Sequence, residues 1–396
     1  MGHRMRKLVK VLAWAAGVLV VLVVAAYVFY QTQKPHHTAS GTPEPIAVSG
    51  DRVLDGIRRG IEFLKARQEP DGEFSAGLLD PRPAFTAMAI HAIANSPDRL
   101  DEKTPFVAKA VEAILSHQQE DGGIYRRGLG LGNYCTCVSI MALEAMHNPA
   151  HDTAIQRARD YVLKCQRENG GMGYGSSGRP DLGNTESALE ALRAAGLPED
   201  SEAFKRAAAF VAQCQNNSET NSARWAGDDG GFIYRPGESR CGTTRTPDGQ
   251  IRYLSYGLMS YAGLVSFLWA GVDRKDPRVQ SAYRWVKENW TLDENCRLKD
   301  AGLYYYYLTM AKALHAYGER RIQTADGAVH DWPVELSERI LSLQGSDGSW
   351  VNANARWMED DRVLVTSFMV RALSVCREVV QQGGEAKPKE ASSHPG

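Results

Sequence analysis

Hydrophobic and polar positions alternate with a helical period along most of the chain. One segment spaces Val53, Ile57, Ile61 and Leu64 on one face and charges on the other, which is typical of an amphipathic helix. Each amphipathic segment precedes a second helical segment that is apolar over a wider arc. These second segments lie at 85–94, 134–146, 184–196, 258–271, 303–318 and 363–375. The difference predicts an outer ring of amphipathic helices around an inner ring of apolar helices.

A short motif recurs between the two helices of each pair. It reads Gln, two residues, Asp or Asn, then Gly, and its first three copies are 50 and 48 residues apart. The clear copies begin at Gln68, Gln118, Gln166 and Gln344. Another copy begins at Gln215, where an insertion from 216 to 227 delays the glycine turn, and one near "VKENWTLDEN" is degenerate. Six units of about fifty residues account for residues 51–380.

The residue types of the motif indicate a structural turn. Glycine supplies the left-handed residue that ends a helix, and Asp or Asn tolerates a tight turn. The Gln amide can bond to free backbone groups, and the aromatic residue that follows is expected to stack on it. These aromatic residues are Phe74, Tyr125, Tyr174, Phe232 and Trp350. We predict structural roles for Gln68, Asp71, Gln118, Asp121, Gln166, Asn169, Gln344, Asp347 and Trp350.

Six helical hairpins that close on themselves would form an α/α toroid, so the predicted fold class is all-α. The glycine-rich stretch at 169–185 joins two helices of this repeat. A phosphate-binding loop would follow a strand, so this stretch is not expected to hold a phosphate.

The N-terminus is basic and then apolar. Arg4, Arg6, Lys7 and Lys10 lie within residues 1–10, and residues 11–30 form an uncharged apolar run that is long enough to cross a bilayer. The positive charges favour a cytoplasmic N-terminus, which predicts a signal-anchor, single-pass membrane protein with an extracytoplasmic toroid, periplasmic if bacterial. Polar residues at 31–50 predict a flexible linker, and residues 381–396 predict a disordered tail.

Charge and cysteine content narrow the partners and the chemistry. A net charge of −1 over 396 residues gives no signature of a nucleic-acid-binding protein. Seven cysteines in an oxidising compartment could form disulfides, and Cys241 and Cys296, in loop-like segments, are the candidate pair. Cys135 and Cys137 are two apart on an expected helix, point away from each other and make a poor metal pair.

The turns between paired helices resemble the repeats of squalene and oxidosqualene cyclases and of protein prenyltransferase β subunits. In particular, "QGSDGSW" followed by "VTSFMVRAL" is similar to the final repeat of squalene–hopene cyclases. The resemblance covers essentially the whole folded part and implies an α/α toroid. For the cyclases it also implies an Asp-x-Asp-Asp-Thr motif whose middle Asp protonates a double bond, and aromatic walls that stabilise cations.

The matching segment of this chain departs from that acidic motif. In "DLGNT", Asp181 and Thr185 fit, but Gly183 stands in the place of the acid and Asn184 in the place of its neighbour. Glycine cannot donate a proton, so the cyclase step loses its acid. The remaining catalytic candidates are Asp181, Glu186 and Asp360, and an acidic residue in the first turn of a helix is also favoured by the helix dipole alone.

The resemblance to prenyltransferases implies a zinc site made by Asp-x-Cys on one inner helix and His near the start of the next. The corresponding helices, "YLSYGLMSYAGLVSFLWAG" and "GLYYYYLTMAKAL", have no Asp, Cys or His at their openings. We therefore predict neither a metal nor a cofactor.

Side chains of the inner helices are expected to face a central pocket. The candidate ligand-binding residues are Tyr134, Asn184, Tyr256, Tyr261, Tyr304 and Tyr307. Of the run "YYYY", Tyr304 and Tyr307 are three apart and can share a helical face. Such tyrosines could stabilise a cation or line an isoprenoid tunnel, and they could equally pack between the two rings.

Three functions remain open from the sequence. The first is a membrane-anchored toroid that binds, and could also transform, an isoprenoid or other lipid; an active form would be a squalene-cyclase-like isomerase or lyase, or a prenyltransferase-like enzyme. The second is a non-catalytic extracytoplasmic module that binds a protein partner. The third is an (α/α)6 hydrolase or lyase that acts on glycans, which would need a pair of inner carboxylates.

Overall fold

The computed structural model describes residues 51–74 and 81–384, and helices dominate this part of the chain. The first helices of the hairpins are α2 (Arg52–Lys65), α4 (Pro105–Ser116), α6 (Asp152–Cys165), α8 (Glu202–Gln213), α10 (Pro277–Glu288) and α12 (Trp332–Ser342). The second helices are α3 (Ala84–Ala94), α5 (Gly132–Glu144), α7 (Leu182–Ala194), α9 (Gly257–Trp269), α11 (Leu303–Tyr317) and α13 (Arg362–Gly384). Two short 3-10 turns, η2 (Pro149–His151) and η3 (Arg356–Met358), complete the helical segments that are described.

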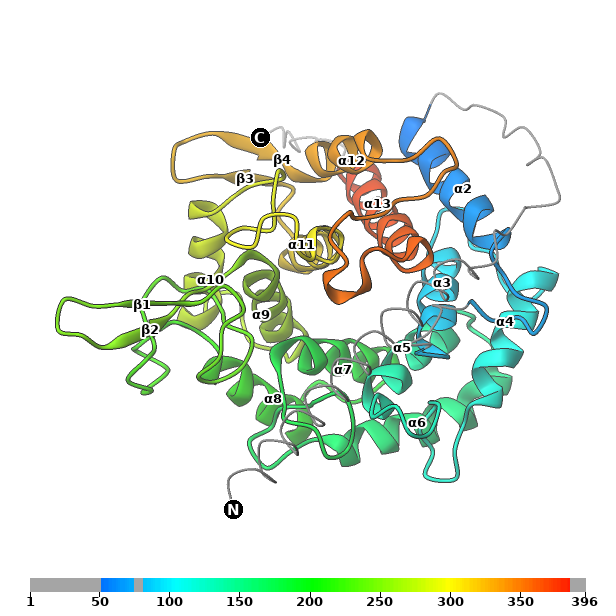
Figure 1. Ribbon diagram of the computed structural model, residues 1–396, viewed down its shortest axis with the longest axis horizontal. Helices are drawn as coiled ribbons and strands as arrows, with labels where there is room; N and C mark the ends of the chain where they lie inside the picture. The colour runs from blue at the N-terminus through cyan, green and yellow to red at the C-terminus, as the bar shows by residue number, and fades with distance from the viewer. Residues whose placement is uncertain (1–50, 75–80, 385–396) are drawn as a thin grey trace, which may run out of the picture. The chain divides into compact units, whose positions relative to one another are not determined.

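The second helices form a closed inner ring (Figure 1). Each packs against the next in chain order, and α13 packs against α3, so the last repeat meets the first. The first helices lie outside this ring, where α2 and α12 both contact α13. This arrangement confirms the predicted α/α toroid and the predicted places of the outer and inner helices. Inner helices are apolar over a wide arc because they contact neighbours on both sides as well as an outer helix.

The motif glutamines join the repeats to one another. In five turns the side-chain amide donates one hydrogen bond to the glycine carbonyl of its own turn and one to a carbonyl of the following outer helix. Gln344 bonds in this way to Gly348 and to Gly56 of α2, at 2.9 Å each, and so links the last repeat to the first. The predicted use of the amide on backbone groups is confirmed, and the bond also sets the spacing between neighbouring hairpins.

The other motif positions hold the turn itself. Asp71, Asp121, Asn169 and Asp347 each accept the backbone N–H two residues later, and the glycine after each has a positive φ. A further recurrent bond was not expected from the sequence. The backbone N–H at the end of each turn donates to a hydroxyl on the inner helix, namely Thr86, Thr136, Thr185, Ser260 or Thr366.

The prediction that an aromatic residue packs at the end of each turn is wrong in two repeats. Phe74, Phe232 and Trp350 are buried as expected of a turn residue that packs inside the hairpin. In the second and third repeats this position is taken by the buried Ile124 and Met172. Tyr125 and Tyr174 come just after these residues in the chain, and Tyr174 is exposed. The buried position at the end of the turn therefore requires an apolar side chain of sufficient size, which need not be aromatic.

The expectation of an all-α chain also needs correction, because the described part is mostly helical with two small hairpins. Strand β1 (Thr243–Arg245) pairs with β2 (Ile251–Tyr253), and β3 (Arg321–Gln323) pairs with β4 (Val329–Asp331), both antiparallel. Each loop contains Asp-Gly, in "TPDGQ" and "TADGA", where glycine takes the positive φ that a tight hairpin requires. Strands of three residues are too short to show an alternating pattern.

Several expectations about the chain ends lie outside the described residues. These are the basic segment 1–10, the apolar run 11–30, the linker 31–50 and most of the tail 381–396, of which only 381–384 are described as the end of α13. Within the described ranges, no helix combines the length and the hydrophobicity needed to cross a bilayer. The cysteines all lie in those ranges and are free thiols, so the candidate pair Cys241 and Cys296 is not bonded in this structure.

Candidate functional site

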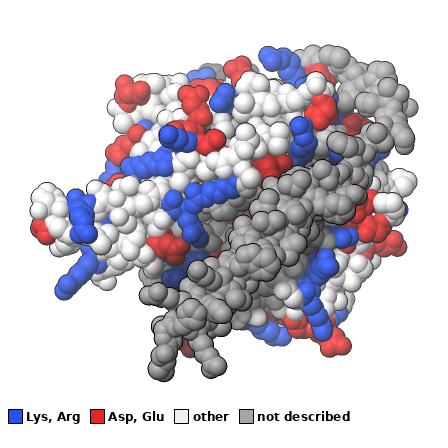
Figure 2. Space-filling view, in the orientation of Figure 1, with Lys and Arg blue, Asp and Glu red and all other residues white. Residues whose placement is uncertain are grey.

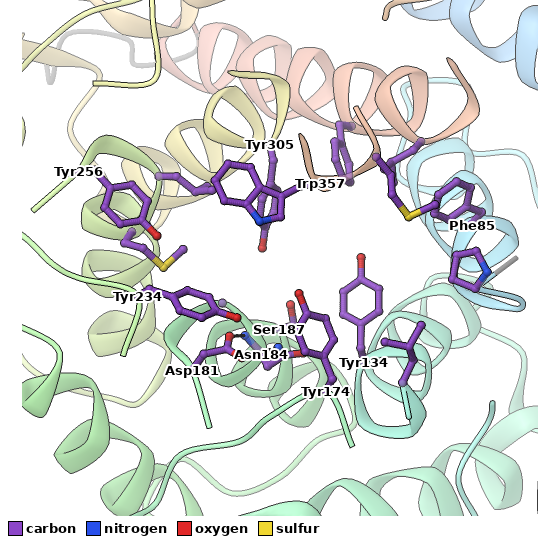
Figure 3. Close-up of a pocket in the computed structure, with 18 residues that line it drawn as sticks. Phe85, Tyr134, Tyr174, Asp181, Asn184, Ser187, Tyr234, Tyr256, Tyr305 and Trp357 are labelled. Carbon is purple, nitrogen blue, oxygen red and sulfur yellow. Dashed lines mark hydrogen bonds between the residues drawn. The ribbon is translucent and has the colours of Figure 1, made fainter. Parts of the chain in front are cut away.

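A cavity of about 330 Å³ lies where the N-terminal ends of the inner helices meet (Figure 3). Each of the six inner helices contributes a residue from its first turns, and loops between the helices complete the wall. The aromatic lining residues are Phe85, Tyr134, Tyr174, Tyr234, Tyr256, Tyr305, Trp357 and Phe368. A pocket of this size and lining is typical of a site for an apolar small molecule, and the aromatic faces could also stabilise a positive charge.

The position that should hold the cyclase acid opens into this cavity and carries no side chain. Gly183 lies in the first turn of α7 and lines the cavity. A Cβ at this position would meet Asp181 Oδ1 at 3.6 Å and Met259 Cε at 3.9 Å, which are ordinary contacts. The cavity could therefore accommodate a side chain at residue 183, and the sequence does not supply one.

Asp181 also lines the cavity, but its carboxylate caps α7. Its Oδ1 accepts the backbone N–H of Asn184 and its Oδ2 accepts the Asn184 side-chain amide, each at 2.9 Å. Burial raises the pKa of Asp181, although these hydrogen bonds and Arg235 act in the opposite direction. Protonation of an alkene needs a strong acid, and a raised pKa makes a carboxyl group a weaker one. Asp181 is therefore a poor substitute for the missing acid.

The six candidate ligand-binding residues fall into two groups. Tyr134, Asn184 and Tyr256 line the cavity, and the buried Asn184 Oδ1 has no hydrogen-bond partner among the described residues. The other three lie between helices, away from the lining. Tyr261 packs edge-on against Tyr306, Tyr304 donates to the Val351 carbonyl, and Tyr307 donates to the Leu292 carbonyl. Tyr261, Tyr304 and Tyr307 are therefore not part of the candidate site.

The tyrosine of α11 that faces the cavity is Tyr305, which the sequence reasoning passed over. Its ring lies 5.5 Å from that of Phe368, and its hydroxyl approaches Glu186 Oε2 at 3.4 Å. Every inner helix contributes its second or third residue to the cavity, as α3 does with Phe85 and α5 with Tyr134. An alignment of the repeats by their helix starts would have left Tyr304 and Tyr305 as the candidates in α11, without deciding between them. Loop residues such as Tyr234 and Trp357 had no comparable signal.

Glu186 belongs to a buried group of charges beneath the cavity, which we call the charged cluster: Glu186, Glu190, Lys312, Arg371 and His91. Lys312 Nζ lies 2.5 Å from Glu186 Oε1 and 2.7 Å from Glu190 Oε2. Burial lowers the pKa of His91 to about 3, with a further contribution from Arg371, so this imidazole is neutral. A hollow of only about 60 Å³ remains among these residues. Glu186 shares Lys312 with Glu190, and burial raises the pKa of Glu186 against the effect of Lys312, so this carboxyl group is not placed as a strong acid.

The acidic residues just before α13 differ in burial: Glu359 lies inside the fold and Asp360 lies at the surface. Glu359 is fully buried, and its carboxylate accepts the Tyr305 N–H at 2.8 Å and the Asn352 amide at 2.7 Å. Burial raises the pKa of Glu359 to about 7, against the effect of these bonds. Asp360, the catalytic candidate, is exposed and does not line the cavity. Trp357 and Met358, just before them, have positive φ angles and reach into the cavity.

Across residues 51–74 and 81–384, no three His, Cys, Asp or Glu side chains lie together in a way that could hold a metal ion. Acidic and basic side chains are interspersed on the face shown in Figure 2.

Family models match two parts of the chain. The squalene–hopene cyclase N-terminal domain matches residues 107–222, and the prenyltransferase α/α toroid domain matches residues 47–129. The chain is 26% identical to drimenyl diphosphate synthase from Streptomyces showdoensis over 196 residues, which are 48% of this chain and 34% of that protein. It is 25% identical to squalene–hopene cyclase from Alicyclobacillus acidocaldarius over 259 residues, 63% of this chain and 40% of that protein. The chain thus spans only a third to two fifths of the length of these relatives.

Solved structures share the fold at low sequence identity. The type II terpene cyclase MstE from Scytonema has a TM-score of 0.50 and 14% identity, with 83% of this chain and 99% of that chain covered. A family 76 glycoside hydrolase from a bovine Bacteroides thetaiotaomicron strain has a TM-score of 0.56 and 9% identity, with 84% and 78% covered. At such identities the likeness shows the fold alone, so any function has to be argued from the cavity.

Proposed function

We propose that this chain, which belongs to the terpenoid cyclase/prenyltransferase α/α toroid superfamily and is distantly homologous to squalene–hopene cyclases, binds an isoprenoid or similar lipid in its aromatic cavity. The observation that carries the proposal is the lining itself, with eight aromatic side chains and one carboxylate among the described residues. An isoprenoid is apolar and branched along its length, and it gains free energy when it exchanges water for such walls.

We further propose that binding occurs without proton-initiated cyclisation. Gly183 provides no acid where the related cyclases are expected to have one. Asp181 is engaged as a helix cap and has a raised pKa, and Glu186 is paired with Lys312. The toroid would then hold, present or transport its ligand, tethered to the membrane by residues 11–30 with the folded part outside the cytoplasm.

The two other functions have less support from the cavity. A glycan hydrolase or lyase needs a pair of carboxylates across its site, and Asp181 is the only acidic residue in the described lining. The likeness to the family 76 glycoside hydrolase therefore extends to the fold. A protein-binding module would not require a hollow centre with an apolar lining, so this function becomes the conclusion if the cavity binds no lipid.

Binding is tested on the full-length chain in nanodiscs. Geranylgeraniol and squalene are added as probes, and bound lipid is measured by native mass spectrometry. We expect one of the two to bind in a one-to-one complex. If neither binds, and no isoprenoid copurifies from an isoprenoid-containing membrane, the proposal is wrong.

The absence of catalysis is tested by restoring the acid with Gly183→Asp, with Gly183→Ala as the matched control. The Cβ atom that both variants add makes only ordinary contacts, so Gly183→Ala should fold, and urea denaturation checks that Gly183→Asp folds as well. We expect wild type and Gly183→Ala to leave squalene and geranylgeraniol unchanged. Cyclised product from the wild-type chain would show that another group supplies the proton and would contradict the proposal.

A further inference from the structure

The connection between α12 and α13 contains a loop with a fixed base (Figure 1). Asn352 and Glu359 are both buried and bond to each other twice: the Asn352 N–H donates to the Glu359 carbonyl at 2.8 Å, and the Asn352 amide donates to Glu359 Oε2 at 2.7 Å. The same amide donates to the Asp300 carbonyl, and the Tyr305 N–H donates to Glu359 Oε1. Both ends of residues 353–358 are therefore held at the start of α11.

The residues between these two ends lie at the boundary between the aromatic cavity and solvent. Ala353, Ala355 and Arg356 are exposed. Trp357 and Met358 are half-buried and line the cavity, and the Trp357 ring points into it (Figure 3). The loop thus covers part of the cavity with two apolar side chains and turns its other side chains outward.

The part of the loop that covers the cavity has a strained backbone. The φ angle is 57° at Trp357 and 63° at Met358, in the left-handed region that residues other than glycine avoid. The indole approaches Gly302 so closely that a Cβ there would lie 2.7 Å from the ring. The Arg356 guanidinium lies 4.3 Å from the centre of the same ring. Contacts of the Trp357 side chain therefore help to hold a backbone that would relax if they were released.

A fixed base and a strained tip give this loop two positions of similar free energy. Release of Trp357 and Met358 from the cavity loses packing, but it also relieves the unfavourable φ angles. The bonds of Asn352 and Glu359 need not break during this change, so the movement is confined to residues 353–358. Loops that cover binding sites commonly move in this way between open and closed positions.

We propose that residues 353–358 form a lid, which moves outward about Asn352 and Glu359 to open the aromatic cavity and closes over it with Trp357 and Met358. The structure shows the closed position. The inference rests on the proposed function, because the lid controls access to the same site, but its test requires no lipid.

A different role for the loop is that of a fixed wall. A fixed wall would expose the interior of the cavity only when the whole fold opens, unless the cavity has a mouth that Trp357 does not cover. Local opening that depends on Trp357 therefore distinguishes a lid from both of these arrangements.

The experiment measures how fast a bulky maleimide labels a cysteine inside the cavity of the full-length chain in nanodiscs. The cysteine is introduced by Ser187→Cys, because Ser187 lines the cavity and is only 8% exposed. Cys376, which is fully buried in α13, serves as the internal reference for opening of the whole fold. Peptide mass spectrometry gives the labelling rate at each position.

We expect residue 187 to be labelled at least ten-fold faster than Cys376, because the lid opens without unfolding of α13. Trp357→Ala should accelerate labelling at residue 187 at least a further ten-fold and leave Cys376 unchanged. Trp225→Ala is the matched control, because Trp225 is a half-buried loop tryptophan that packs against Tyr253 outside the cavity lining. It should change neither rate.

Two results would overturn the lid. Equal rates at residue 187 and Cys376 would show that the cavity does not open locally. A fast rate at residue 187 that Trp357→Ala leaves unchanged would show that the cavity is open without movement of this loop. Either result leaves the proposed function to be decided by lipid binding. If the lid is confirmed and no isoprenoid binds, the proposed function fails and the lid stands.

Discussion

The aromatic cavity and the charged cluster lie one below the other inside the same ring, and Tyr134, Ser187, Tyr305 and Phe368 line both hollows. They differ in the polar groups that they hold. In the cluster, Lys312 contacts both Glu186 and Glu190, and Arg371 lines the same hollow, so groups of opposite charge face one another. In the cavity, the Asn184 Oδ1 has no hydrogen-bond partner within the described part of the chain, and the walls are mostly aromatic.

This difference assigns separate roles to two regions built from the same helices. A buried charge without a partner is costly, so we expect the contacts of Lys312 with Glu186 and Glu190 to hold α7 and α11 together. The cavity leaves apolar surface and an acceptor without internal partners. Changes in the cluster should therefore alter stability, and changes in the cavity should alter ligand binding.

The largest effect is expected from Lys312→Met. This change leaves Glu186 and Glu190 buried without their cation, and we expect a loss of about 3–5 kcal/mol in the free energy of unfolding, measured by urea denaturation. Lys205→Met removes an exposed partner of Glu202 and should cost less than about 1 kcal/mol. If the two variants lose the same stability, the buried contacts of Lys312 contribute no more to the fold than an exposed ion pair does.

The next effect concerns Glu359, a buried acid beside the cavity that is bonded to neutral donors. Its pKa of about 7 in the folded chain exceeds the unfolded value of 4.5, so the folded state holds this proton more tightly. Stability should therefore fall as pH rises through the interval from 4.5 to 7, by up to about 3 kcal/mol from this group.

Glu359→Gln should remove that part of the pH dependence, as measured by urea denaturation at pH 5 and pH 8. The exposed neighbour provides the control, because Asp360→Asn should keep the wild-type slope. An unchanged slope in Glu359→Gln would show that this carboxyl group is already ionised in the folded chain.

A smaller effect, on binding alone, is expected from Trp357→Ala. Trp357 reaches the cavity from the segment that precedes α13. Removal of its ring should lower the affinity for an isoprenoid ligand about ten-fold, which is about 1.4 kcal/mol in binding free energy. The stability of the fold should change little. Trp225→Ala is the control, because Trp225 packs edge-on against Tyr253 outside the cavity lining. Affinity is measured by titration with geranylgeraniol. Equal affinities of the wild type and Trp357→Ala would show that Trp357 does not contribute to ligand binding.

The smallest effect is expected at the boundary between the two regions. Tyr305→Phe removes a hydroxyl whose contact with Glu186 is long, at 3.4 Å, and keeps the ring that faces the cavity. We expect a change below about 1 kcal/mol in stability and less than three-fold in lipid affinity, by the same two measurements. A large loss of stability would show that the cluster depends on Tyr305 as well as on Lys312.

The repeat motif by itself determined the fold, because its chemistry is local. In the four clear copies, the glutamine, the Asx residue and the glycine lie within five residues of one another, so the sequence shows the turn, and the period between turns gives the number of hairpins. The missing acid at Gly183 could also be read directly, since no packing can give glycine a proton to donate. The sequence likewise selected Tyr134, Asn184 and Tyr256, which line the cavity.

Only the tertiary structure decided which other residues line the cavity together with Tyr134, Asn184 and Tyr256. A helical pattern gives the angles between side chains but not the rotation of the helix about its own axis, which packing against neighbours sets. For that reason Tyr305 faces the cavity while Tyr304 and Tyr307 do not. Partners from distant segments, such as Lys312 for Glu186, and loop residues such as Arg235 and Trp357 reach their places only when the ring closes.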